Sequence, residues 1–357
     1  MRMKKILFIA AVALAAAACS KTYSVGPDSQ KGIGFSTWND VLTKAPMTGF
    51  ANGDVIEVFG FKGTNTSVFE AQEVSFDGAK WSYSPLRYWD TNEDSYTFFA
   101  VYPKDVLASG TYALDGKFKT IERSFNGQTE NLLVAQKKNV VKANYGEVPL
   151  LFKHAASLVD IKVKKHSDIE DAKVVVNSIA LSGIKVAGSY EVASYDSNNN
   201  PVGATVSGVE GLGWTPGSAV NADAAPYKKT DATTLTYGAG VGTDNAAELI
   251  SSLVVMPQAF STTSGPAITI NYSIVSGSAT LGDLETITYT PEAIYIGSFD
   301  TTDPDPTPQT NEDSVISAWK PGVHYTYYIT INTNAITFSA SVDDWAEETS
   351  ALHYIVK

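Results

Sequence analysis

The sequence predicts an all-β protein made of two β-sandwich domains in tandem. Apolar and polar residues alternate with a period of two, which is typical of half-buried strands. Gly, Pro, Asn, Asp and Ser interrupt these segments at short intervals, as they do in sandwiches. About 340 residues follow an N-terminal leader, more than one ordinary core organises, so two domains are expected.

The clearest strand patterns are spread over the whole chain. In residues 157–164, Val159, Ile161 and Val163 face one side, whereas Asp160 and the neighbouring lysines face the other. Other strands are predicted at 55–61, 96–102 and 268–274, and a hairpin at 325–331 and 336–342.

The chain is divided by changes in composition. The predicted segments are a leader at 1–18, an N-terminal segment at 19–44, and domains at 45–148 and 149–357. Residues 194–245 are rich in small and polar residues and are predicted to form long loops within the second domain. Three prolines at 304–308 predict an exposed loop over residues 300–313.

The N-terminus has the layout of an export signal. A short basic stretch precedes an apolar run at residues 6–18, which is too short to cross a bilayer as a helix. Four alanines then precede Cys19, the only cysteine of the chain. This pattern predicts lipidation of Cys19 after cleavage of the leader. The alternative is an ordinary secretory signal followed by a spare cysteine.

Charge excludes one class of partner. Without the three basic residues of the leader, the chain has 23 basic and 38 acidic side chains, a net charge of −15. Binding to nucleic acid depends on neutralising phosphates with Lys and Arg, so the sequence predicts no nucleic-acid partner.

No motif predicts catalysis or a cofactor. The four histidines, at positions 154, 166, 324 and 353, lack metal-site spacing, and His154 is expected to be structural. The Asp303–Thr307 segment resembles a phosphatase motif, but its alternating prolines prevent the strand that such a motif requires. Asp196–Asn200 resembles a calcium loop but has Pro201 where a glycine is needed. The chain is therefore expected to be neither an enzyme nor a metalloprotein.

Several segments, in order along the chain, resemble the fimbrillin family, the subunits of the type V pili of Bacteroidales. The order of these segments identifies the chain as a member, although no single one is specific. They are Ile33–Ser36 with Thr43–Ala45, Gly53–Phe59, Tyr88-Trp89 with Phe98–Pro103, Gln128–Leu133, Phe152–Ala155, Pro257-Gln258, Trp319–Tyr325 and Trp345.

The resemblance implies a fold and an assembly mechanism. The fold is two transthyretin-like β-sandwiches in tandem, exported as an outer-membrane lipoprotein. A protease would cut between Lys44 and Ala45 and release the first strand, Gly32 to Thr37, with Ile33 and Phe35 facing the core. The sheet edge left behind would accept a strand from another pilus subunit. An anchor subunit, in contrast, would keep its first strand, and Lys44 would then be an ordinary loop residue.

The C-terminal tail is the expected donor strand. Leu352, Tyr354 and Val356 alternate there and would fill the vacated groove, although the tail could equally form an edge strand of its own domain. The partners implied are other pilus subunits and, as adhesion targets, a host glycan or protein. A competing hypothesis is a monomeric glycan-binding surface lipoprotein, with Trp81, Trp89 and Trp214 as candidate sugar-stacking residues. Core packing is the alternative for these tryptophans, and an extracellular hydrolase is the least favoured class.

Overall fold

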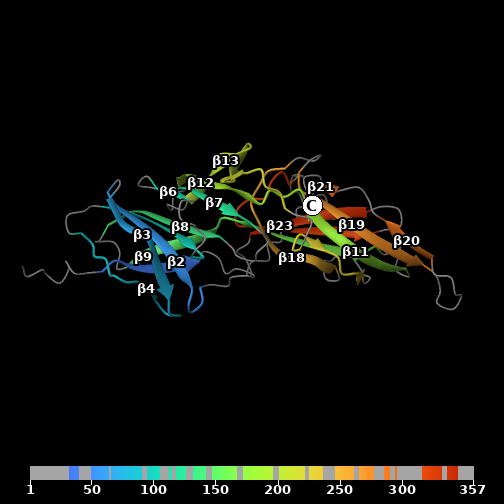
Figure 1. Cartoon of the computed structure of the whole chain (residues 1–357), viewed down its shortest axis with the longest axis horizontal. Helices are drawn as coiled ribbons and strands as arrows, with labels where there is room; N and C mark the ends of the chain where they lie inside the picture. Colours follow the sequence, from blue (N-terminus) through green and yellow to red (C-terminus); the bar gives the residue numbers. More distant parts are fainter. Residues whose placement is uncertain are drawn as a thin grey trace, which may run out of the picture.

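The computed structural model of the chain is all-β in every part that it describes. The described residues are 32–39, 50–63, 66–90, 95–104, 112–114, 118–125, 132–141, 147–166, 172–195, 201–221, 225–235, 246–260, 265–276, 285–289, 294–295, 316–331 and 336–344. Their strands form four sheets along one long axis, with the N-terminal strands at one end and β11, β19 and β20 at the other (Figure 1). Within these ranges, no helix is long and apolar enough to span a bilayer.

The N-terminal sheet has seven strands in the order β1-β9-β8-β5-β2-β3-β4. These are β1 (Gly34–Asn39), β2 (Val55–Lys62), β3 (Thr66–Phe76), β4 (Trp81–Ser82), β5 (Tyr96–Tyr102), β8 (Leu133–Val140) and β9 (Glu147–His154). The outermost strands of this order approach each other, because Trp81 Nε1 in β4 donates a hydrogen bond of 2.9 Å to Thr37 Oγ1 in β1. The sheet thereby closes around an aromatic-rich core that includes Phe69, Phe98 and Phe152.

The C-terminal half is a sandwich of two sheets. One has the order β18-β10-β22-β23, with β18 (Ala247–Val255), β10 (Ser157–Lys165), β22 (Val323–Ile331) and β23 (Ile336–Asp344). The other contains β16 (Lys228–Lys229), β11 (Lys173–Ser182), β19 (Ala267–Ser276) and β20 (Glu285–Tyr289), with β17 (Thr233–Leu235) and β21 (Ile294–Tyr295) paired beside them. Their core is mainly aliphatic, and Trp319 is fully buried in it. The predicted hairpin is present as the antiparallel pair β22 and β23.

A third unit joins the two halves. Its sheet has the order β14-β13-β12-β7-β6, with β14 (Val209–Gly211), β13 (Pro201–Val206), β12 (Ala187–Tyr195), β7 (Phe118–Ser124) and β6 (Tyr112–Leu114), and β15 (Trp214–Pro216) pairs with β12. It lies beside the centre of the molecule in Figure 1. We call β6, β7 and β12 to β15 the bridging sheet, because β6 and β7 precede the crossover between the halves and the other strands follow it.

Two features differ from the predicted segmentation. Residues 201–216, within the segment predicted as long loops, form β13, β14 and β15, because they pair with one another and with β12. The boundary placed between residues 148 and 149 falls inside β9, which pairs with β1 and β8. The chain leaves the N-terminal sheet at Ala155 and Ala156, between β9 and β10.

Candidate functional site

The first strand, β1, is the element on which the assembly hypothesis depends. It spans Gly34–Asn39, two residues later than predicted, and Gly32 just before it forms an isolated antiparallel bridge with Tyr88. The strand runs parallel to β9, with Phe35 beside Val148. Ile33 and Phe35 are 0% and 2% exposed, so both face the core, which is the orientation that the family resemblance implies.

The ring of Phe35 packs among three other aromatic rings. Its ring lies at centroid distances of 5.4 Å from Phe69, 5.7 Å from Phe98 and 5.7 Å from Tyr83. Edge-to-face and tilted pairs at these distances add to the stabilisation from burial. If β1 left the sheet, the remaining three rings would border an apolar groove.

The other side of β1 is held by the segment that includes β4 and the residues after it. The Ile33 amide donates to the Arg87 carbonyl at 2.8 Å, and the Tyr83 hydroxyl donates to the Ile33 carbonyl at 2.6 Å. Burial raises the pKa of Tyr83, which keeps this hydroxyl a neutral donor. From residue 33 onward, the first strand contacts β4 and this segment through side chains and individual hydrogen bonds. The first strand is therefore an edge strand, whose backbone ladder is with β9 alone.

Several predicted site residues lie outside the described residues. These are Cys19, the cleavage pair Lys44 and Ala45, and the donor-strand residues Leu352, Tyr354 and Val356. The Asp303–Thr307 and Asp196–Asn200 segments lie outside them as well.

The tryptophans named for glycan binding are mostly core residues. Trp89 is 2% exposed and Trp214 0% exposed, so neither can stack on a sugar. Trp81 is half-buried and packs against Phe50 edge to face and against Phe76 at a tilt. Its Nε1 donates a hydrogen bond to Thr37. The glycan hypothesis therefore loses two of its three candidate residues, for which core packing is the correct interpretation.

The histidines are structural where the structure describes them in detail. His154 is 7% exposed, and burial lowers its pKa to about 4. His324 Nε2 donates to Asp160 Oδ2 at 2.8 Å, and Asp160 Oδ1 accepts the Ser252 amide at 2.6 Å. Within the described ranges, no three His, Cys, Asp or Glu side chains cluster closely enough to hold a metal ion.

Sequence reasoning missed the Asp160–His324 pair. Alternation placed Asp160 on the polar face, yet its exposure is only 7%. Burial would raise the pKa of this carboxyl, but the hydrogen bond and charge of His324, together with the Ser252 amide, leave it below its ordinary value. The residues are 164 positions apart, and β10 and β22 are neighbours only through parallel pairing. Nothing in the local sequence of either strand signals this contact.

The described part of the chain is thus all-β, with stacked sheets and a first strand that lies at the edge of its sheet. The model of the fimbrillin-like family matches residues 43–345, most of the chain. The chain therefore belongs to the fimbrillin-like family.

Individual relatives are distant in sequence. The chain is 24% identical over 216 residues to the Fimbrium subunit Fim1C of Phocaeicola vulgatus, a match that covers 51% of this chain and 57% of that protein. The chain thus aligns with little more than half the length of this relative. A crystal structure of a fimbrial protein from Bacteroides vulgatus is similar with a TM-score of 0.58 and 18% identity, covering 88% of this chain and 99% of the other. This likeness supports the fold.

Proposed function

We propose that the protein is a structural and adhesive subunit of a surface fimbria, without catalytic activity. It is exported, acylated on Cys19, and held on the outer membrane as a precursor. Proteolysis between Lys44 and Ala45 then releases β1, and the C-terminal tail of another subunit takes its place. Its partners are other pilus subunits, as a homopolymer or heteropolymer, and a host glycan or protein at the adhesive surface.

The observation that carries this proposal is the position of β1. It is an edge strand, yet its Phe35 and the preceding Ile33 are almost completely buried. Full burial of each such side chain is worth about 1.5–3 kcal/mol, so loss of β1 leaves a sheet edge with a strong tendency to bind a replacement strand.

The tail has the spacing that a replacement requires. Ile33, Phe35 and Thr37 contact the core side at every second position, and Leu352, Tyr354 and Val356 repeat this spacing with an aliphatic, an aromatic and a β-branched residue. Two alternatives remain open for the tail and for the processing: an edge strand within its own half, and an anchor subunit that keeps β1.

The proposal is tested on fimbriae released from cells that produce the full chain. We expect a free N-terminus at Ala45 and a ladder of subunits that resists mild detergent. The double variant Tyr354→Asp and Val356→Asp should abolish the ladder, because two charges would enter an apolar groove. The matched control, His353→Asp with Ile355→Asp, changes the outward positions of the same strand and should preserve it. An unaffected ladder in the first variant would exclude the tail as donor.

A further inference from the structure

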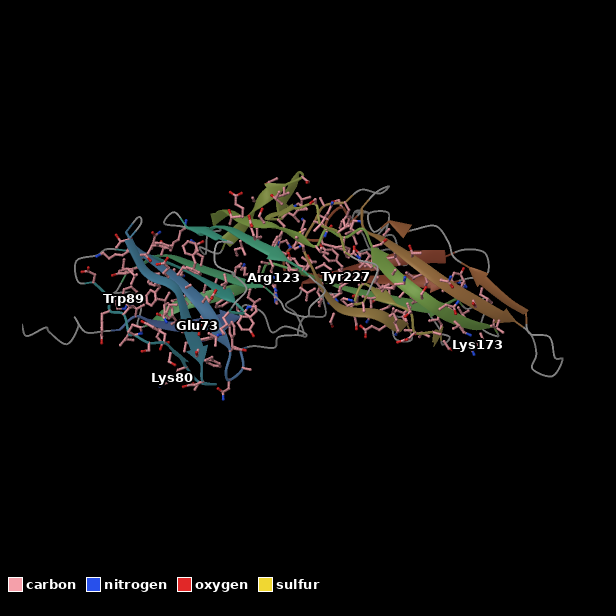
Figure 2. The ribbon with its side chains drawn as sticks, viewed as in Figure 1. Glu73, Lys80, Trp89, Arg123, Lys173 and Tyr227 are labelled. Atoms are coloured by element: carbon pink, nitrogen blue, oxygen red, sulfur yellow. The ribbon has the colours of Figure 1, made fainter. Side chains whose placement is uncertain are left out.

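Exposed apolar side chains concentrate at one place. In the described part of the chain, the large hydrophobic side chains that are mainly exposed are Leu86 at 50%, Tyr88 at 53% and Val220 at 54%. Two of these three lie within the segment Ser84–Tyr88, in which every residue is exposed. We call this segment the apolar tip. Trp89, the next residue, lies toward the end of the molecule opposite Lys173 (Figure 2).

The backbone of the apolar tip is hydrogen-bonded at Arg87 and Tyr88, next to the exposed side chains. The Arg87 amide donates to the Tyr83 hydroxyl at 3.3 Å, and the Arg87 carbonyl accepts the Ile33 amide. Tyr88 is bridged to Gly32, and Leu86 packs so closely over Gly32 that an added Cβ there would lie 3.0 Å from its Cδ2. Backbone groups paired in this way can approach an apolar phase without the cost of unpaired polar groups.

The chemistry of the apolar tip matches the surface of a bilayer. Leucine is favourable in the acyl region, and tyrosine rings concentrate at the level of the headgroups. Arg87, exposed between them, has the planar guanidinium that pairs with phosphates, on a stem long enough to reach them. The nearest acidic side chain along the chain, Asp90, forms an ion pair with Lys62 at 2.6 Å and so does not leave an isolated negative charge there.

The chain segment that links the acylated Cys19 to the folded protein joins it beside the apolar tip. Only twelve residues, 20–31, separate Cys19 from Gly32, which lies against Leu86 and Tyr88. Even a fully extended chain of that length reaches no more than about 45 Å. Once Cys19 is anchored, contact of the apolar tip with the membrane is intramolecular, with an effective concentration on the order of mM. Two side chains are then enough to hold the apolar tip on the membrane, although they would not bind a free protein to it.

We propose that, in the acylated precursor, the apolar tip rests on the outer leaflet of the membrane, with Leu86 and Tyr88 in the interface and Arg87 on lipid phosphates. The contact orients the N-terminal half toward the membrane and the C-terminal half away from it. It rests on the proposed acylation of Cys19. Cleavage at Lys44 removes both the tether and Gly32, so processing releases the molecule from this contact.

The test uses spin labels on the acylated full chain, reconstituted in vesicles of phosphatidylethanolamine with a minor fraction of phosphatidylglycerol. Labels are placed at Leu86→Cys, Tyr88→Cys and Ser84→Cys, one per variant, and at Val220→Cys as the matched control. Acylated Cys19 does not react with the label. We expect labels at 84, 86 and 88 to lose accessibility to a water-soluble nickel reagent and to gain accessibility to oxygen when the protein binds vesicles. The label at Val220 should show neither change.

The outcomes separate the two proposals. A full chain that is isolated from cell membranes and carries no acyl group on Cys19 would refute the lipid anchor itself. An acylated, vesicle-bound chain whose apolar tip is as accessible as Val220 would overturn the membrane contact alone. Labels at 86 and 88 that are already shielded without vesicles would show that residues 20–31 of the chain cover the apolar tip, which also overturns it.

Discussion

At the scale of single residues, Phe35 is a side chain of β1 that packs deep in the core of the N-terminal sheet. Truncation to alanine would remove its contacts with Phe69, Phe98 and Tyr83 and leave a cavity. We expect Phe35→Ala to lower the free energy of unfolding of the unprocessed chain by about 3–5 kcal/mol. Ser36→Ala, at the next position and turned away from the core, should change it by no more than about 0.5 kcal/mol. Urea unfolding measures both, and equal effects would mean that β1 is not packed as described.

His154 makes stability depend on pH. Its pKa is about 4 in the folded chain, because burial disfavours the charged form, and 6.5 is the ordinary value expected when unfolded. Below pH 6.5 only the unfolded state binds the proton, so stability falls as the pH drops from 6.5 to 4. A shift of this size corresponds to a loss of about 3 kcal/mol.

The measurement is chemical unfolding across that pH range, compared with His154→Gln, which cannot titrate. The variant should show a smaller decrease from pH 6.5 to 4, whatever its absolute stability. Titration of Asp160 does not affect the comparison between the two proteins. Its folded pKa lies below the ordinary 3.8, so the stability it contributes is lost only at still lower pH. Parallel curves for the two proteins would rule out His154 as the source.

The residue scale also shows where sequence reasoning reaches its limit. Alternation alone correctly predicted the inward positions Val159, Ile161 and Val163 in β10. It failed for Asp160, because the β10–β18 pairing shifts register beside that residue and Ser252 takes a left-handed backbone (φ 53°). The hydrogen bond from the Ser252 amide to the Asp160 carboxylate depends on tertiary structure. A period-two pattern in the sequence carries no information about it.

At the scale of elements, the bridging sheet contains the strands that contradict the loops predicted from the sequence. Its strands β13, β14 and β15 have only six, three and three residues, and Gly203 and Gly211 lie within the first two. Such segments have weak intrinsic preference for strands, so pairing partners decide their structure. The long strands β2, β5, β10, β19, β22 and β23 were predictable because each carries its own alternating pattern.

Glycine in this sheet permits close packing, which a matched pair of substitutions can measure. Gly213 and Gly208 both have positive φ, +74° and +81°. An added Cβ at Gly208 meets nothing within 4 Å, whereas at Gly213 it would clash with the Tyr190 ring. Gly208→Ala should cost about 1–2 kcal/mol from backbone strain alone. Gly213→Ala should cost about 1–3 kcal/mol more, because Tyr190 must move. Thermal unfolding compares them, and equal losses would contradict the packing of Tyr190 on Gly213.

At the scale of the whole molecule, the two halves share hydrogen bonds, a strand pair and a buried cluster, and are not joined by a linker alone. The crossover residues are held by both neighbours, since Trp214 Nε1 donates to the Ala155 carbonyl at 2.5 Å and the Gly322 amide to the Ala156 carbonyl at 2.8 Å. β7 from before the crossover pairs with β12 from after it. One buried cluster accordingly joins side chains from both halves, including Phe59, Phe99, Trp214 and Met256.

These shared contacts predict that the halves unfold together. Native-state hydrogen exchange should give one common free energy for the slowest amides of β5 in the N-terminal half and β19 in the C-terminal half. Trp89→Ala, a truncation inside the N-terminal core, should lower both values together. Trp214→Ala should cost about 3–5 kcal/mol and also separate the two values, because it removes the side chain that fills the junction. Two different free energies in the unmodified protein would show that the bridging sheet does not couple the halves, and the rod would then bend at Ala155 and Ala156.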